Sequence, residues 1–205
     1  MTLLDRLRAD LSATVRLPLP HGGDADDSAG DVAAAVLVAI TDRREPGLLL
    51  TQRPDTMRRH PGQVAFPGGQ VDPEDADVIA AALREAEEEI ALLRELPQIA
   101  GTLPPYHTVT GYAVTPVVAA VPADLPLVAH DREVAALFEV PLAWALDPAT
   151  WVRREVVYGG RERRYWEAWW EGRRIWGATA AMLINLRVRL PSFVPPGATA
   201  RSSAA

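Results

Sequence analysis

The chain has 205 residues, 48% of them apolar, which is enough for one sizeable hydrophobic core and short for two. It contains no cysteine, which excludes disulfides, thiolate metal sites and a cysteine nucleophile, and which favours a cytoplasmic protein. The formal net charge of -6 argues against a general affinity for nucleic acid. Every basic residue other than histidine is an arginine, so an anion site in this chain would use guanidinium groups.

The two ends of the chain differ in composition from its middle. Residues 1–13 alternate charge with leucine, which predicts a short amphipathic helix rather than a signal peptide. Residues 21–30 are rich in Gly and Asp and predict a flexible connection, and the tail from Pro191 is rich in Pro, Ser and Ala and predicts disorder. We therefore expect an N-terminal helix and connection over 1–30, one main domain over 31–190, and a disordered tail over 191–205.

The first half of the main domain predicts a hairpin, a loop and a helix. Val32–Thr41 and Gly47–Gln52 are apolar runs typical of buried strands, and a short turn joins them. The longest apolar run, Val32–Ile40, is far below the ~20 residues that a membrane span needs, so we expect no membrane crossing. Arg53–Gly69 is polar and punctuated by Pro and Gly, which indicates a functional loop. Ala, Leu and Glu then predict a helix from Asp75 or Ala76 to about Leu93.

The second half predicts several shorter strands, an irregular segment after the third of them, and a closing helix. The expected strands are Gln98–Leu103, Ala113–Val121, Ala135–Val140, Arg153–Tyr158, Arg164–Trp170 and Arg173–Trp176. The expected helix is Gly177–Arg189.

The segment from Arg84 to Ile90 carries the chemistry. On a helix, Glu85, Glu88 and Glu89 share one face while Glu87 points elsewhere. Three carboxylates on one face repel each other, and a hard divalent cation such as Mg²⁺ or Mn²⁺ is the natural compensation. A Glu-rich helix is more often a solvated surface. The preceding pair Gly68 and Gly69, which allows close approach of the backbone, favours the metal site here.

Together these residues resemble the Nudix family, whose box runs Gly, five residues, Glu, seven residues, Arg-Glu-apolar-any-Glu-Glu-any-Gly-apolar. The positions that match are Gly69, Arg84, Glu85, Ala86, Glu88, Glu89 and Leu92. The sequence departs from the box in that Asp75 replaces the first Glu, one extra residue precedes Arg84, and Ala91 replaces the late Gly.

Within that family the chain is similar to the coenzyme A pyrophosphatase subgroup. The subgroup's upstream signature is matched by Leu49-Leu50-Thr51-Gln52-Arg53, Arg58, Gly62 and Phe66-Pro67-Gly68-Gly69, although Pro54 stands where the signature prefers a small residue. Segments downstream, Leu103-Pro104-Pro105-Tyr106, Thr110-Gly111-Tyr112, Thr115-Pro116 and Ile175-Trp176-Gly177-Ala178-Thr179, also look like this subgroup. The resemblance covers about Val32 to Leu190.

The resemblance implies an α/β fold, an α/β/α sandwich with a mixed sheet, and hydrolysis of coenzyme A to 3′,5′-ADP and 4′-phosphopantetheine. Glu85 and Glu89, with Glu88, are the expected ligands of Mg²⁺ or Mn²⁺, and one of these carboxylates accepts the proton of the attacking water. Which of them does so, Glu88 and Glu89 being the candidates, stays open.

The remaining expected site residues are basic or glycine. Arg84 is expected to orient the glutamates. Arg53 and Arg58 are candidates for the substrate phosphates, with surface charge as the alternative, and Gly68 and Gly69 are expected to line the substrate site.

Other polar residues are weaker candidates. His60, His107 and His130 have no ligand-like spacing, and Glu133 is either a further metal ligand or, more often in such stretches, a solvated or capping residue. Two further sets are expected to be structural: the tryptophans Trp166, Trp169 and Trp170 in the core, and the arginines Arg153, Arg154, Arg161, Arg163 and Arg164 on a solvated hairpin.

Two other functions remain open. One is a Nudix hydrolase of ADP-ribose, NADH or a nucleoside triphosphate, and the other is a non-catalytic nucleotide-binding module. The upstream signature argues against the first, and the retained glutamates argue against the second. In each case the partner is a small molecule, with neither nucleic acid nor membrane, and the sequence leaves the oligomeric state open.

Overall fold

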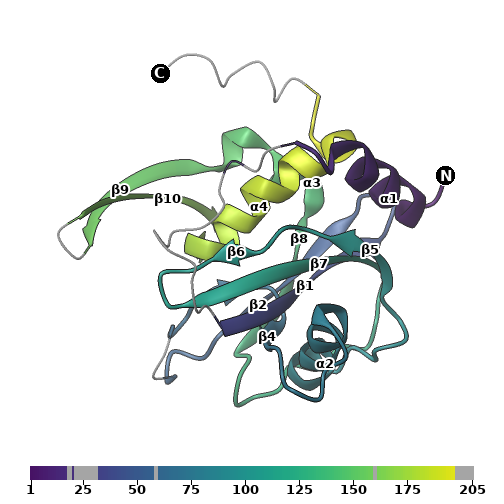
Figure 1. Cartoon of the computed structure of the whole chain (residues 1–205), viewed down its shortest axis with the longest axis horizontal. Helices are drawn as coiled ribbons and strands as arrows, with labels where there is room; N and C mark the ends of the chain where they lie inside the picture. The colour runs from purple at the N-terminus through teal and green to yellow at the C-terminus, as the bar shows by residue number, and fades with distance from the viewer. Residues whose placement is uncertain (18–19, 21–31, 58–59, 159–160, 197–205) are drawn as a thin grey trace.

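The computed structural model describes residues 1–17, 20, 32–57, 60–158 and 161–196, and its centre is a mixed sheet (Figure 1). The eight-stranded sheet consists of β1 (Val32–Asp42), β2 (Gly47–Gln52), β3 (Val64–Ala65), β4 (Gly68–Gln70), β5 (Gln98–Thr102), β6 (Tyr106–His107), β7 (Tyr112–Pro122) and β8 (Ala136–Pro141). Its main path runs β3-β2-β1-β7-β5, with β4 beside β1, β6 beside β7 and β8 beside β2. β1 and β7 pair in parallel and the other neighbours pair antiparallel, so the predicted mixed sheet is confirmed.

Helices cover both faces of this sheet. α2 (Val78–Ile90) lies on one face, and α1 (Leu3–Thr14) and α4 (Gly177–Arg189) lie on the other (Figure 1). β1 contributes Leu37 and Ala39 to the α2 side and Val38 and Ile40 to the other side. Because both faces of β1 are buried, its sequence is a continuous apolar run rather than an alternating one. The predicted α/β/α sandwich is confirmed.

A second, three-stranded sheet extends from the body as an arm. It has the order β11-β10-β9, formed by β9 (Val152–Tyr158), β10 (Arg161–Trp170) and β11 (Arg173–Trp176) (Figure 1). Trp166 and Trp170 pack against the core as predicted, whereas Trp169 is 61% exposed, so the expectation for that residue was wrong. Trp169 lies on the opposite face of the sheet because side chains alternate along a strand.

The helix that carries the glutamates starts later than predicted. α2 begins at Val78 because the side chain of Asp77 accepts the backbone N–H groups of Ile79 and Ala80 and so caps the helix. It ends at Ile90, since Ala91 takes the left-handed conformation with φ 54° and ψ 30°. The late Gly of the Nudix box occupies this position, and the structure gives the physical reason for a glycine there.

Both ends of the chain depart from prediction. The first helix belongs to the same core as the main domain, because Leu3 and Leu7 are buried in it. The first residues of the expected disordered tail are ordered: Pro191–Phe193 form a 3₁₀ turn, and Phe193 packs beneath the guanidinium of Arg6. The connection over 21–30 and the tail over 197–205 lie outside the described residues.

Several short elements were missed by the sequence patterns. α3 (Leu142–Leu146) forms in the segment expected to be irregular, and β6 forms beyond the Pro-Pro pair. β3 and β4 form within and at the end of the segment expected to be a loop. All four are too short to show a periodic signal. None of the helices in the described part of the chain has the length and apolar character needed to span a bilayer.

We predict that Ala91→Gly raises the free energy of unfolding. An alanine held at positive φ costs about 1 kcal/mol that glycine avoids, and part of this gain is offset by the greater freedom of glycine in the unfolded chain. Urea unfolding should show a higher midpoint with an unchanged slope, while Ala80→Gly in the helix should lower the midpoint. A midpoint for Ala91→Gly at or below that of the wild type would show that the left-handed cap is not strained.

Candidate active site around helix α2

A glycine pair brings the backbone of β4 directly against the carboxylates of α2. A side chain at Gly68 would collide with the backbone of Ala35 and Val36 on β1, and Gly68 itself has φ 153°. A Cβ at Gly69 would lie 2.6 Å from the carboxyl group of Glu85. The backbone N–H of Gly68 donates to Glu89 Oε2 at 3.2 Å. The absence of side chains at both positions permits this approach.

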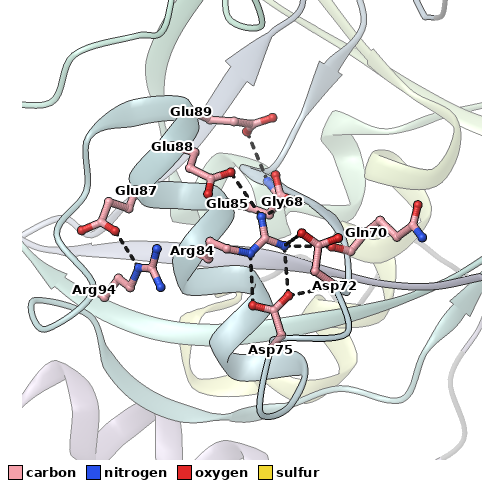
Figure 2. A network of polar contacts seen from close by, with 10 residues as sticks. All are labelled: Gly68, Gln70, Asp72, Asp75, Arg84, Glu85, Glu87, Glu88, Glu89 and Arg94. Carbon is pink, nitrogen blue, oxygen red and sulfur yellow. Dashed lines mark hydrogen bonds and ion pairs between the residues drawn. The ribbon is translucent and has the colours of Figure 1, made fainter.

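Arg84 organises the acidic cluster (Figure 2). Its Nε and Nη2 donate to the two oxygens of Asp75 at 3.1 and 3.0 Å, and its Nη2 also donates to the carbonyl of Gln70 at 3.1 Å. Its Nη1 donates to Glu85 Oε1 at 3.0 Å and to Glu88 Oε2 at 3.2 Å. One guanidinium therefore ties the loop before α2 to two of the glutamates.

Asp75 fills the place of the box's first Glu. Its side chain is only 6% exposed, and the ion pair with Arg84 lowers its pKa. Although its side chain is shorter than that of glutamate, Asp75 forms a bidentate pair with Arg84.

The three predicted carboxylates share one face of α2, as their spacing predicts, and Glu87 points to the other side, where it pairs with Arg94 (Figure 2). They differ in environment. Glu88 is 55% exposed, Glu85 is 17% exposed, and Glu89 is 5% exposed. Burial raises the pKa of Glu85 against the opposing effect of Arg84. Burial also raises the pKa of Glu89 to about 7, and repulsion by Glu85 and Glu133 adds to the shift.

The residues fit a divalent cation by their chemistry rather than by their present spacing. Among the described residues, no group of three acidic or histidine side chains is arranged as a ready-made metal site. Glu88 turns toward Arg84, and Glu89 toward Gly68. Burial raises the pKa of both Glu85 and Glu89, and the contacts of Glu85 with Arg84 and of Glu89 with the backbone of Gly68 do not offset this cost of charging them. Carboxylate oxygens are the donors that Mg²⁺ and Mn²⁺ prefer, and a bound cation would stabilise their charged forms.

The loop after β7 was the part of the site that sequence reasoning undervalued. Backbone N–H groups of Val128 and His130 donate to the last carbonyls of α2, those of Ile90 and Glu89. This docking brings the charge of Glu133 near enough to raise the pKa of Glu85 and Glu89. A depression of about 450 Å³ lies beside it, lined by Glu88, Ala91 and residues 128–132. No spacing signal in the sequence links Glu133 to a helix that lies some forty residues earlier.

The basic candidates have different outcomes. Arg53 follows β2, and its backbone N–H donates to the carbonyl of Gln63. Its positive charge lowers the pKa of Glu89, and its Nε is buried without a hydrogen-bond partner in the described structure. Arg58 lies outside the described residues. His60 is exposed, and His107 lies on β6.

Comparison with known proteins identifies the family. The pattern of the NUDIX domain matches residues 31–159. The chain is 50% identical over 157 residues to the proteins named Uncharacterized Nudix hydrolase NudL of Escherichia coli O1:K1 / APEC and of Shigella boydii serotype 18, a match that covers 77% of this chain and 82% of each relative.

Similar solved structures include a C. elegans Ap4A hydrolase in a binary complex, with 23% identity, a TM-score of 0.46 and coverage of 53% of this chain and 80% of that one. A MutT/nudix family protein from Enterococcus faecalis has 17% identity and a TM-score of 0.47, with coverage of 85% of this chain and 65% of that one.

We predict that metal-free protein becomes more stable as pH falls, through Glu89. Its pKa is about 7 in the folded protein and near the ordinary glutamate value of 4.5 in the unfolded chain. Such a carboxyl contributes stability that is fully present below the lower value and is lost as pH rises through the higher one. Between about pH 8 and pH 5.5 the gain should be roughly 2 kcal/mol. Chemical unfolding at a series of pH values, with a chelator present, measures this change in the free energy of unfolding.

Glu89→Gln should remove most of this gain, whereas the matched variant Glu87→Gln should keep it. Equal pH dependence in wild type and Glu89→Gln would mean that Glu89 is not the group that titrates.

Proposed function

This chain belongs to the Nudix family of hydrolases, and from that premise we propose that it hydrolyses the pyrophosphate bond of coenzyme A or its derivatives to 3′,5′-ADP and 4′-phosphopantetheine. Family membership makes it a hydrolase of nucleoside diphosphate derivatives, and Nudix hydrolases generally use a divalent cation, typically Mg²⁺. Coenzyme A as the substrate is the finer part of the proposal. The observation that carries it is the upstream signature from Leu49 to Gly69, which the general Nudix box does not include.

The fold supports this proposal because it joins the signature to the box. Gly68 and Gly69 at the end of the signature contact Glu89 and Glu85. Arg53 at its start lies close enough to Glu89 to lower its pKa. A substrate phosphate bound near the carboxylates would therefore also meet the signature's guanidinium.

We assign roles to the residues on this geometry. Glu85 and Glu89, with Glu88, would hold the cation, which neutralises the pyrophosphate and acidifies a bound water. Arg84 holds Glu85 and Glu88 in place rather than touching substrate, since its donors are already used. The buried Nε of Arg53 has no hydrogen-bond partner among the described residues and would donate to a phosphate oxygen of the substrate. Arg58 is a further candidate for binding the substrate phosphates.

The chemical step needs a proton acceptor. The oxygen of water attacks one phosphorus of the pyrophosphate, and the bond to the bridging oxygen breaks. Attack at either phosphorus yields the same two products. A carboxylate of the cluster that the cation does not fully engage would accept the water's proton, and Glu89 and the exposed Glu88 are the two candidates.

Two other functions compete with this one. A Nudix hydrolase of ADP-ribose, NADH or another nucleoside diphosphate derivative would use the same carboxylates. A non-catalytic nucleotide-binding module would have little use for them, and the retained Glu85, Glu88 and Glu89 argue against it.

We predict that the protein converts coenzyme A to 3′,5′-ADP and 4′-phosphopantetheine when Mg²⁺ or Mn²⁺ is present. Mass-resolved chromatography measures the two products. Glu89→Gln and Glu85→Gln should each lower kcat/KM by at least about 100-fold, because each removes a charge that the cation needs. Glu87→Gln, on the other side of α2, should retain activity. Cleavage of ADP-ribose or NADH without cleavage of coenzyme A would refute the substrate, and no cleavage of any pyrophosphate would favour the binding module.

We further predict that Arg53→Gln raises KM for coenzyme A and for dephospho-coenzyme A alike, by about tenfold, because its position beside Glu89 points to the pyrophosphate that both compounds share. Arg44→Gln, an exposed arginine on the turn after β1, is the control. A loss confined to coenzyme A would instead place Arg53 at the 3′-phosphate, and no change would make it a surface charge.

A further inference from the structure

Strand β9 is an exposed edge. It forms one side of the arm, and within the described residues β10 is the one strand that pairs with it (Figure 1). All residues from Val152 to Val157 are exposed. Val152 is 47%, Val156 44% and Val157 68% exposed.

Such an edge attracts another strand. The outer side of β9 presents backbone N–H and C=O groups that no strand in the described structure satisfies. Edge strands that remain single are usually short, charged, interrupted by proline or a bulge, or covered by another element. Over Val152–Tyr158, β9 has no proline and pairs with β10 without a register shift. Its charged residues are Arg153, Arg154 and Glu155, which carry both signs and can therefore pair with a second copy.

We propose that β9 pairs antiparallel with β9 of a second copy of this chain, about a two-fold axis at Arg154, so that the two three-stranded sheets join into one. This contact goes beyond the proposed hydrolysis and does not depend on it.

The sequence of β9 is complementary to itself in this register. Antiparallel pairing about residue 154 places Arg153 opposite the partner's Glu155 and Val152 opposite the partner's Val156. The two-fold axis produces each pair twice. Opposite charges and apolar pairs directly across two strands are the contacts that stabilise a sheet.

The neighbouring registers lack this match. Pairing about Glu155 would place two glutamates opposite each other and leave Arg153 opposite valine. Pairing about Arg153 would also place two arginines opposite each other, and it would set Val152 opposite the partner's Arg154 rather than opposite a valine. The register at Arg154 is therefore the one of the three that sets Arg153 against an opposite charge.

Arg154 itself sits on the axis and faces its own copy. Its charge is partly balanced, because its Nε donates to Glu167 Oε1 at 2.7 Å, a carboxylate that also pairs with Arg174. Glu155 is held by Arg164 at 2.9 Å on its own hairpin, whereas Arg153 makes no ion pair within the described residues. Arg153 is therefore the cation that the partner's Glu155 would engage.

The first test is the mass of the full chain in solution, measured by light scattering at tens of micromolar protein. We expect twice the mass of the chain for the wild type and the mass of a monomer for Arg153→Glu, which would face the partner's Glu155. The combined Arg153→Glu and Glu155→Arg variant should recover the dimer, because it restores opposite charges with their order reversed. Circular dichroism confirms that each variant is folded.

The second test uses the absence of cysteine in the chain. Arg154→Cys should form a disulfide dimer on mild oxidation, because residues opposite each other in an antiparallel pair have Cα atoms about 4.5 to 5.5 Å apart, within disulfide reach. Val157→Cys is the matched control: it is exposed on the same strand but lies far from its own copy in this register. A monomeric wild type, or a dimer that Arg153→Glu does not weaken and Arg154→Cys does not cross-link, would overturn the proposal.

Discussion

The crowding of carboxylates on one half-buried face of α2 is the constraint on which this molecule depends. Sharing that face costs Glu85, Glu88 and Glu89 free energy, through repulsion between like charges and through the burial of Glu85 and Glu89. Arg84 offsets part of this cost, and the double glycine supplies a backbone N–H for Glu89. These contacts do not offset the cost of burying a charged Glu89, whose pKa is raised mainly by burial and further by repulsion from Glu85 and Glu133. On this ground we propose that the carboxylate cluster binds a divalent cation.

Most of the fold could be predicted because its central elements are long and strongly patterned. β1 and β7 are buried runs, and α4 has the predicted bounds Gly177–Arg189. The errors lie where a local interaction outweighs composition. The cap at Asp77 moves the start of α2, and the packing of Phe193 orders the start of a Pro-rich tail. Composition does not report such single contacts.

The site was predictable as far as it is local in sequence. Helical spacing alone places the three glutamates together and Glu87 apart. The pairing of Arg84 with Asp75 and the proximity of Glu133 both require the tertiary fold. Arg53 was singled out by the family resemblance, but its effect on the pKa of Glu89 could be recognised only in the structure. The exposure of Arg153 and Arg154 on a solvated hairpin was predicted from the sequence, whereas the open outer edge of β9 among the described residues follows only from the strand order.

The most direct test of the central claim is cation binding by the α2 carboxylates, measured as Mn²⁺ bound to the protein in an electron paramagnetic resonance titration without substrate. We expect the wild type and Glu87→Gln to bind Mn²⁺ with the same affinity and Glu85→Gln and Glu89→Gln to bind it at least about tenfold more weakly. Equal binding by all four proteins, or no binding by the wild type, would contradict the account.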